Sequence, residues 1–282
     1  MQLNNKDAQI FIPDNAEIPL ALARTTHLCV AAHQDDIEIM AFGPIVECFG
    51  QKDKWFTGVT VTDGGGSPRS GVYENFTDDE MKKVRAQEQN TAAAIGQYAA
   101  QLLLAYPSSQ VKDPANDTLI AELKSIIERC KPDVIYTHNL ADKHDTHVSV
   151  ALRVISAVRL LADGYKPKKV FSLEVWRGLD WLCDEDKAVL DTSAHQNLSA
   201  ALLGVFDSQI AGGKRYDLAT LGRRSANATF FASHAVDECD SMTYGLDITD
   251  LVDDTTLSPD KFISKYIDRF KDEVVKRIER FV

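Results

Sequence analysis

Short apolar runs rich in β-branched residues alternate with longer segments from residue 27 onward. These runs predict strands at residues 27–33, 56–62, 102–106, 134–137 and 170–176. Between them, acidic first turns and apolar positions spaced three or four apart predict helices, most clearly at residues 77–97, 117–130 and 147–161. Strands that alternate with helices form repeated βαβ units around a parallel sheet. We therefore expect an α/β fold with a doubly wound, mostly parallel sheet.

The C-terminal third has a more helical pattern, with predicted helices at residues 193–210, 215–223 and 261–281. The helix predicted at 261–281 has clear start signals before it: Ser258 is a candidate N-cap, Pro259 suits the first helical position, and Asp260 is an acid in the first turn. Apolar side chains then recur in one stripe, at Phe262, Tyr266, Phe270, Val274, Ile278 and Phe281. We expect this stripe to be buried on the flank of the sheet, and residues 246–259 to form a solvated connection. No linker separates domains, so we expect one domain over residues 1–282, with a core at 25–180 and a C-terminal extension at 181–282.

Composition and charge exclude several classes of protein. The 44% of apolar residues excludes a disordered chain, and 31 basic against 42 acidic residues give a net charge of −11. No concentrated positive segment is present, so nucleic acid is not expected as a partner. No apolar run approaches the roughly 20 residues of a membrane span, and the start of the chain lacks a signal-peptide pattern, which predicts a cytoplasmic location. The five cysteines form no C-x-x-C pair and predict no disulfide framework.

Polar clusters follow the first and fourth predicted strands, where a parallel sheet presents its ligand crevice. His33 and Asp36 are three residues apart at the start of a helix, so their side chains share a face and can reach one cation. Asp35 points elsewhere and is free to accept a proton beside that cation. His144 and His147 repeat the spacing, and either could complete a set of two histidines and one aspartate. Three protein ligands plus water are typical of a catalytic zinc site.

Each cluster also has a purely structural interpretation, because a histidine at a strand end is usually hydrogen-bonded and adjacent aspartates usually cap a helix. Two clusters at one sheet edge favour the metal centre. The glycines from Gly64 to Gly66 lack both the spacing of a dinucleotide loop and the lysine of a P-loop, which favours close approach to a substrate or a simple turn. Arg85 and Glu88 could form an exposed ion pair, or the guanidinium could grip a polar substrate.

The segment from Ala32 to Glu38, AHQDDIE, resembles the A-H-P-D-D-x-E signature of the LmbE-like deacetylases, or PIG-L superfamily. His144 and His147, after Thr137-His138-Asn139, resemble the second signature of that superfamily, H-x-D-H. Similarity extends to Thr62-Asp63-Gly64 and to Arg85 and Glu88. It covers residues 25–165 well and the remainder loosely.

This resemblance implies a Rossmann-like domain that holds one divalent metal per chain, usually Zn²⁺, and removes the N-acetyl group of an amino sugar, as in the N-acetylglucosaminylphosphatidylinositol deacetylases. His33, Asp36 and His147 would bind the metal. Asp35 would be the general base for a metal-activated water, and His144 would stabilise the oxyanion or act as an acid.

The same resemblance implies that Arg85 and Asp63 contact the substrate, a small N-acylated sugar or glycoside. Family members often associate, so a homo-oligomer is a further expectation. In the C-terminal third, Arg223, Arg224 and His234 lie beside aromatic residues and could form a substrate wall, although a structural role for His234 is an equal alternative.

The chain departs from the family pattern at two places. Gln34 replaces the proline of the first signature, which removes no ligand. Asp145 and Thr146 stand where proline and aspartate are common, so the carboxylate that orients the histidines is displaced; Asp145 and Asp142 are both candidates for this role. Two other functions compete with the deacetylase: a carbohydrate-binding module without turnover, and a phosphoesterase, which would usually need two metals and more carboxylates.

Overall fold

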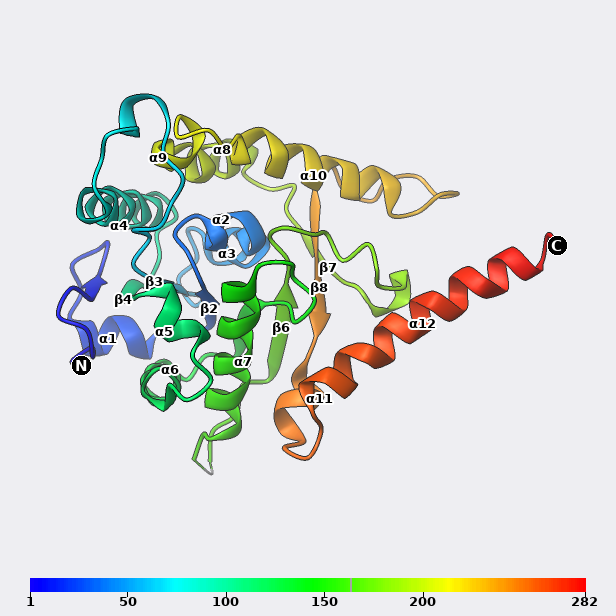
Figure 1. Ribbon diagram of the computed structural model, residues 1–282, viewed down its shortest axis with the longest axis horizontal. Coiled ribbons are helices and arrows are strands. Elements are labelled where there is room, and N and C mark those ends of the chain that lie inside the picture. Colours follow the sequence, from blue (N-terminus) through cyan, green and yellow to red (C-terminus); the bar gives the residue numbers. More distant parts are fainter. Residues whose placement is uncertain (163) are drawn as a thin grey trace.

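An eight-stranded sheet forms the centre of the computed structural model, which describes residues 1–162 and 164–282 (Figure 1). The strand order is β1-β4-β3-β2-β5-β6-β8-β7. The five strands from β4 to β6 in this order are parallel, whereas β1, β8 and β7 are joined through antiparallel pairs. The strands are β1 (Gln9–Phe11), β2 (His27–Ala31), β3 (Phe56–Thr62), β4 (Ala100–Tyr106), β5 (Val134–His138), β6 (Lys169–Leu173), β7 (Ala188–Asp191) and β8 (Met242–Asp247).

Helices cover both faces of the sheet (Figure 1). One layer contains α1 (Ile18–Ala23), α5 (Ser108–Lys112), α6 (Asp117–Cys130), α7 (Asp145–Arg159) and α11 (Thr249–Asp253). The other contains α2 (Asp36–Met40), α3 (Phe42–Cys48), α4 (Asp78–Ile95), α8 (Gln196–Gly204), α9 (Asp207–Ile210) and α10 (Tyr216–Phe230). Every residue of β2 and β3 is buried, as expected for parallel strands covered on both faces. The predicted fold class is therefore confirmed.

Helix α4 shows how local sequence sets an element boundary. The Thr77 hydroxyl accepts a hydrogen bond from the Glu80 backbone N–H at 3.3 Å, and the Glu80 carboxylate accepts one from the Thr77 N–H at 2.8 Å. This capping box satisfies two backbone donors that a helix start leaves free. The helix begins at Asp78, one residue after the predicted start.

The C-terminal extension differs from the prediction in several places. Residues 246–259 are not a solvated connection: they include the end of β8 and helix α11, and Leu246, Leu251 and Val252 are buried. The predicted helix at 193–210 is divided into α8 and α9. β7 and β8, from the C-terminal extension, add two strands to the sheet formed by the core. The division between core and extension at residue 180 stays a prediction.

Helix α12 (Pro259–Glu279) begins where the cap and proline predict. Phe262 is buried and Tyr266 packs against the same core, but Ile278 is 57% exposed and Phe281 is 84% exposed. The expectation of one continuous buried stripe is therefore wrong for the second half of the helix. The second half is exposed because the helix is long and continues past the body of the molecule toward the C-terminus (Figure 1). None of the described helices is both long and apolar enough to cross a membrane.

The order of the strands reverses beside β2. Successive strands β2, β3 and β4 run outward on one side, and β5 and β6 run outward on the other. In open α/β sheets, ligands bind beyond the carboxyl ends of the strands at such a point. The segments that follow β2 and β5 are therefore brought side by side there.

Candidate metal centre and active site

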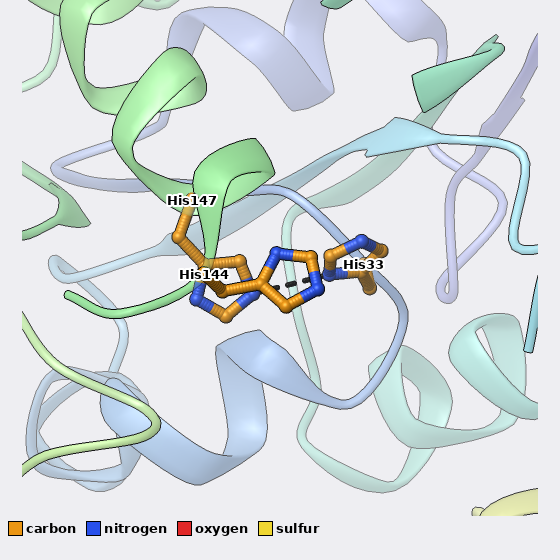
Figure 2. A group of neighbouring side chains, drawn as sticks. All are labelled: His33, His144 and His147. Atoms are coloured by element: carbon orange, nitrogen blue, oxygen red, sulfur yellow. Dashed lines mark hydrogen bonds between the residues drawn. The ribbon is translucent and has the colours of Figure 1, made fainter. Parts of the chain in front are cut away.

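Three side chains from these two segments converge on one point. His33 Nδ1 lies 3.1 Å from His147 Nε2 and 3.2 Å from Asp36 Oδ2, and the last two atoms are 3.3 Å apart. Figure 2 shows His33 and His147 facing each other across the gap between the segments. Ligand atoms held about 2.0–2.1 Å from a tetrahedral ion lie about 3.3 Å from one another. This triangle of atoms therefore fits one small cation, and the assignment of the three residues as ligands stays a prediction.

Two other ligand sets overlap with this triangle. His33, His144 and His147 offer nitrogens that all lie within 4.8 Å of one another, and Asp36, His138 and His147 do the same. His147 belongs to every set. Since the sets share that residue, they describe alternatives for a single ion at one place.

The turn between β2 and α2 positions the first two side chains. The His33 backbone N–H donates to Asp36 Oδ2 at 2.7 Å, which holds the carboxylate beside the imidazole. Asp35 has a φ of 80°, a left-handed conformation that is uncommon for a residue other than glycine. Its backbone N–H donates to Gln89 Oε1 at 3.2 Å. Such strain persists only where the surrounding structure enforces it.

The other end of α2 is held by Arg224. Its guanidinium donates to the Glu38 and Ile39 carbonyl oxygens at 2.6 and 3.1 Å and is fully buried. A cation at a helix C-terminus satisfies carbonyls that have no partner within the helix. Arg223 similarly donates to the Val175 carbonyl at 2.6 Å. Neither arginine lines the cavity described below, so the structure does not bring the two arginines of the expected substrate wall to the candidate site.

Asp142 orients His147. Its Oδ2 lies 3.2 Å from His147 Nδ1 and accepts the Val175 backbone N–H at 3.1 Å. A carboxylate on the far nitrogen of a histidine fixes the ring and leaves the other nitrogen free for a metal. Asp145 is exposed at the start of α7. Of the two candidates that the sequence leaves open, the structure selects Asp142.

His138 is a buried neighbour that sequence reasoning missed. Its ring stacks on His147 with 3.9 Å between centroids, and its Nε2 accepts the Ala32 backbone N–H at 2.8 Å. Burial, with the nearby charge of His147, lowers the pKa of His138 to about 4, so it is neutral at physiological pH. Its place at the end of β5 was visible in the sequence, but its packing against His147 was not.

The protonation of the triangle also fits a cation. Burial alone would lower the pKa of His147, but the carboxylates of Asp36 and Asp142 raise that pKa to about 10. Burial alone would raise the pKa of Asp36, and His147 with the other histidines brings it well below its usual value. These carboxylates therefore favour the protonated, positively charged form of His147. A divalent cation would displace the proton, because metal ligands bind in their deprotonated forms.

Asp35 lines a cavity of about 540 Å³ together with His33, Asp36 and His147. Burial raises the pKa of Asp35 to about 7, although the Arg85 guanidinium, 3.6 Å from its Oδ1, acts in the opposite direction. A carboxyl group with a pKa near neutrality can both accept and return a proton at physiological pH.

His144 lines the same cavity at the N-terminal boundary of α7. Burial, followed by the charges of His147 and His33, lowers its pKa, so the neutral form is favoured. Its ring is stacked parallel to that of Trp176, with 6.4 Å between centroids. In Figure 2 the ring of His144 lies in front of the line between His147 and His33, and its centroid is 4.6 Å from that of His147 and 5.0 Å from that of His33.

Of the remaining expected site residues, some line the cavity and some lie away from it. Asp63, Gly64 and Gly66 line the cavity, and the positive φ of 74° at Gly64 places the backbone against the Gln34 side chain. His234 is exposed in the segment after α10 and is not among the residues that line the cavity. The structure therefore brings Asp63, but not His234, to the candidate site.

Arg85 and Glu88 do not form the exposed ion pair considered above, because both are buried. The guanidinium of Arg85, in the cavity wall, donates to Ser67 Oγ at 2.6 Å and to the Gln34 carbonyl. The carboxylate of Glu88 accepts the Ser208 backbone N–H at 2.7 Å and its hydroxyl at 2.6 Å. The two residues therefore fix separate segments around the cavity.

Comparison with known proteins agrees with the site. The family model of the PIG-L proteins, described as GlcNAc-PI de-N-acetylase, matches residues 28–158, which contain both motifs. A search of curated protein sequences found no match.

Solved structures show the same fold. The N,N'-diacetylchitobiose deacetylase from Pyrococcus horikoshii has a TM-score of 0.63 at 15% identity, covering 86% of this chain and 91% of that one. The 4-carboxy-2-hydroxymuconate hydratase from Pseudomonas putida has a TM-score of 0.61 at 18% identity, with coverages of 79% and 95%. A teicoplanin deacetylase in a zinc-inhibited form has a TM-score of 0.54 at 14% identity, with coverages of 80% and 99%.

At these identities the likeness shows the fold alone, and one of the three proteins is a hydratase, so fold does not fix the reaction. The family model and the shared fold together confirm the resemblance found in the sequence. Residues 28–158 therefore match the PIG-L, or LmbE-like, family, and the chain as a whole shares the fold of deacetylases of that kind.

Proposed function

We propose that the protein is a metal-dependent hydrolase that removes an acetyl or related acyl group from the nitrogen of a small amino sugar or glycoside. The observation that carries the proposal is the triangle of His33, Asp36 and His147, with mutual distances of 3.1–3.3 Å, in one cavity with the buried carboxyl group of Asp35. The match of residues 28–158 to the family model of the GlcNAc-PI de-N-acetylases supports the choice of an N-acyl bond.

His33, Asp36 and His147 would hold one divalent cation, and two histidines with one carboxylate suit Zn²⁺. When bound, such a cation polarises the amide carbonyl and lowers the pKa of water. Asp35 accepts a proton from the attacking water as the new C–O bond forms. It then returns the proton to the nitrogen as the C–N bond breaks, so that acetate and the free amine leave. His144, in its neutral form, donates a hydrogen bond to the carbonyl oxygen.

The competing functions have less support. A carbohydrate-binding module without turnover does not need the buried carboxyl group of Asp35, whose pKa lies near neutrality. A phosphoesterase would usually hold two metals, whereas the triangle and the two ligand sets that overlap with it share His147 and describe one position.

Release of acetate from a panel of N-acetylated sugars tests the proposal. We expect hydrolysis by the metal-loaded protein, loss of activity after chelation, and its recovery with about one equivalent of divalent metal per chain. Zn²⁺ is added both at one equivalent and in excess, because a teicoplanin deacetylase of the same fold is described in a zinc-inhibited form. Sugar binding without acetate release under every metal condition would favour the carbohydrate-binding module.

A further inference from the structure

Two lysines line the outer part of the cavity. Lys112 ends α5 in one helical layer, and Lys214 lies between α9 and α10 in the other. Both side chains belong to exposed residues, so their ammonium groups reach solvent at the mouth of the cavity. The Lys214 ammonium lies 5.6 Å from the centre of the Trp176 ring, which also lines the cavity. The mouth therefore has positive charge beside an aromatic wall.

Among the described residues, no carboxylate pairs with Lys112 or Lys214. The neighbouring Lys82 shows the usual arrangement, since it lies 3.4 Å from Asp63 and 3.3 Å from Asp79. Over residues 1–162 and 164–282, by contrast, neither Lys112 nor Lys214 takes part in an ion pair. The whole chain carries a net charge of −11, which would repel an anion at long range. At physiological ionic strength that field is screened beyond about 8 Å, so local cations decide what the mouth attracts.

A buried amide lies beside Lys214, whose backbone N–H donates to the Gln209 carbonyl oxygen at 2.8 Å. Gln209 lines the cavity and is only 4% exposed, and within the described part of the chain its Nε2 has no hydrogen-bond partner. Buried polar groups are normally paired, so a donor left free in a cavity wall indicates an acceptor that arrives with a ligand. Gln209 and the two lysines all offer N–H groups, which are the groups that bind carboxylate and phosphate oxygens.

We propose that the substrate carries an anionic group, a carboxylate or a phosphate, in addition to its acylated nitrogen, and that Lys112, Lys214 and Gln209 bind this group. The proposal rests on the proposed function, since it places the amide at the metal centre and the anion at the mouth of the same cavity.

The test compares neutral and anionic N-acetylated sugars that share one ring. N-acetylglucosamine is the neutral parent, its 1-phosphate and 6-phosphate are the phosphate arms, and N-acetylmuramic acid, with its lactyl carboxylate, is the carboxylate arm. We expect at least one anionic sugar to have kcat/KM about tenfold or more above the parent. The advantage should shrink as salt is raised, because salt screens exposed charges.

Lys214→Gln and Lys112→Gln should each lower the ratio of anionic to neutral kcat/KM about three- to tenfold, mainly through KM. Lys166→Gln removes the same charge at an exposed lysine that pairs with Asp253 and does not line the cavity, so it should leave the ratio unchanged. Equal kcat/KM for neutral and anionic sugars, or an equal effect of Lys166→Gln, would overturn the proposal.

Calorimetric binding separates this proposal from the proposed function. If none of the sugars is hydrolysed, the function is wrong, and binding of glucosamine 6-phosphate against glucosamine still tests the anion site. The anion site is supported if glucosamine 6-phosphate binds more tightly than glucosamine, and if this difference in affinity decreases in Lys214→Gln but not in Lys166→Gln. Equal binding of both sugars to the unmodified protein would contradict it.

Discussion

His147→Ala is expected to leave the purified protein with little bound divalent metal and to lower kcat/KM for amide hydrolysis by about 10³-fold or more. The reason is that His147 takes part in all three ligand sets, and its Nε2 lies within 3.3 Å of both other ligand atoms of the triangle. A catalytic metal contributes several kcal/mol of charge stabilisation in the transition state, and each 1.36 kcal/mol corresponds to about tenfold in rate. Metal content after dialysis is measured by mass spectrometry, and activity by acetate release.

The substitution also leaves the buried carboxylates of Asp36 and Asp142 without their histidine, so folding has to be measured alongside. Circular dichroism and thermal unfolding of the variant establish that it is folded. His195→Asn is the matched control: His195 is exposed and has a positive φ of 54°, which asparagine tolerates. A folded His147→Ala protein with one metal per chain and full activity would refute the ligand assignment.

Asp35→Asn is expected to keep the metal and to lower kcat by about 10²- to 10⁴-fold, the usual contribution of a general base. The amide has nearly the same shape as the carboxyl group but cannot accept the proton of the attacking water. Asp35 is not part of the triangle, so the metal content should remain near that of the unmodified protein. Single-turnover acetate release and metal analysis on the same sample provide both readouts.

Asp145→Asn is the control for this change, because it removes a carboxylate from an exposed position two residues from His147. It should alter kcat by less than about twofold, as most surface substitutions away from a site have small effects. An Asp35→Asn protein with the turnover of the unmodified chain would exclude Asp35 as the base. Loss of the metal in that variant would instead assign it to the metal centre.

The core of the fold could be predicted because its strands are buried on both faces. β2 and β3 appear in the sequence as continuous apolar or β-branched runs, and such runs need no tertiary information to be recognised. The short strands β7 and β8 lack this signal, since β7 has four residues that alternate between partly buried and exposed positions. β8 joins the sheet by antiparallel pairing with β6, more than 70 residues away, and local patterns do not encode such a partner.

The site could be predicted in part for a similar reason. Parallel strands present their carboxyl ends at one edge, so the residues after β2 and β5 had to lie near each other once the sheet was assumed. Contacts that support the site were not visible in this way. Arg224 reaches the Glu38 carbonyl over 186 residues of sequence, and His138 stacks on His147 through packing rather than through any motif. Both depend on how the two helical layers close around α2.

A crystal structure of the metal-loaded protein, with anomalous diffraction measured at the absorption edge of the metal, tests the central claim most directly. We expect one anomalous peak per chain, with the metal bonded to His33 Nδ1, Asp36 and His147 Nε2 and the Asp35 carboxyl group facing the same cavity. A peak bound by His33, His144 and His147 without Asp36, a peak held by His138, or no peak near His147 would contradict the account.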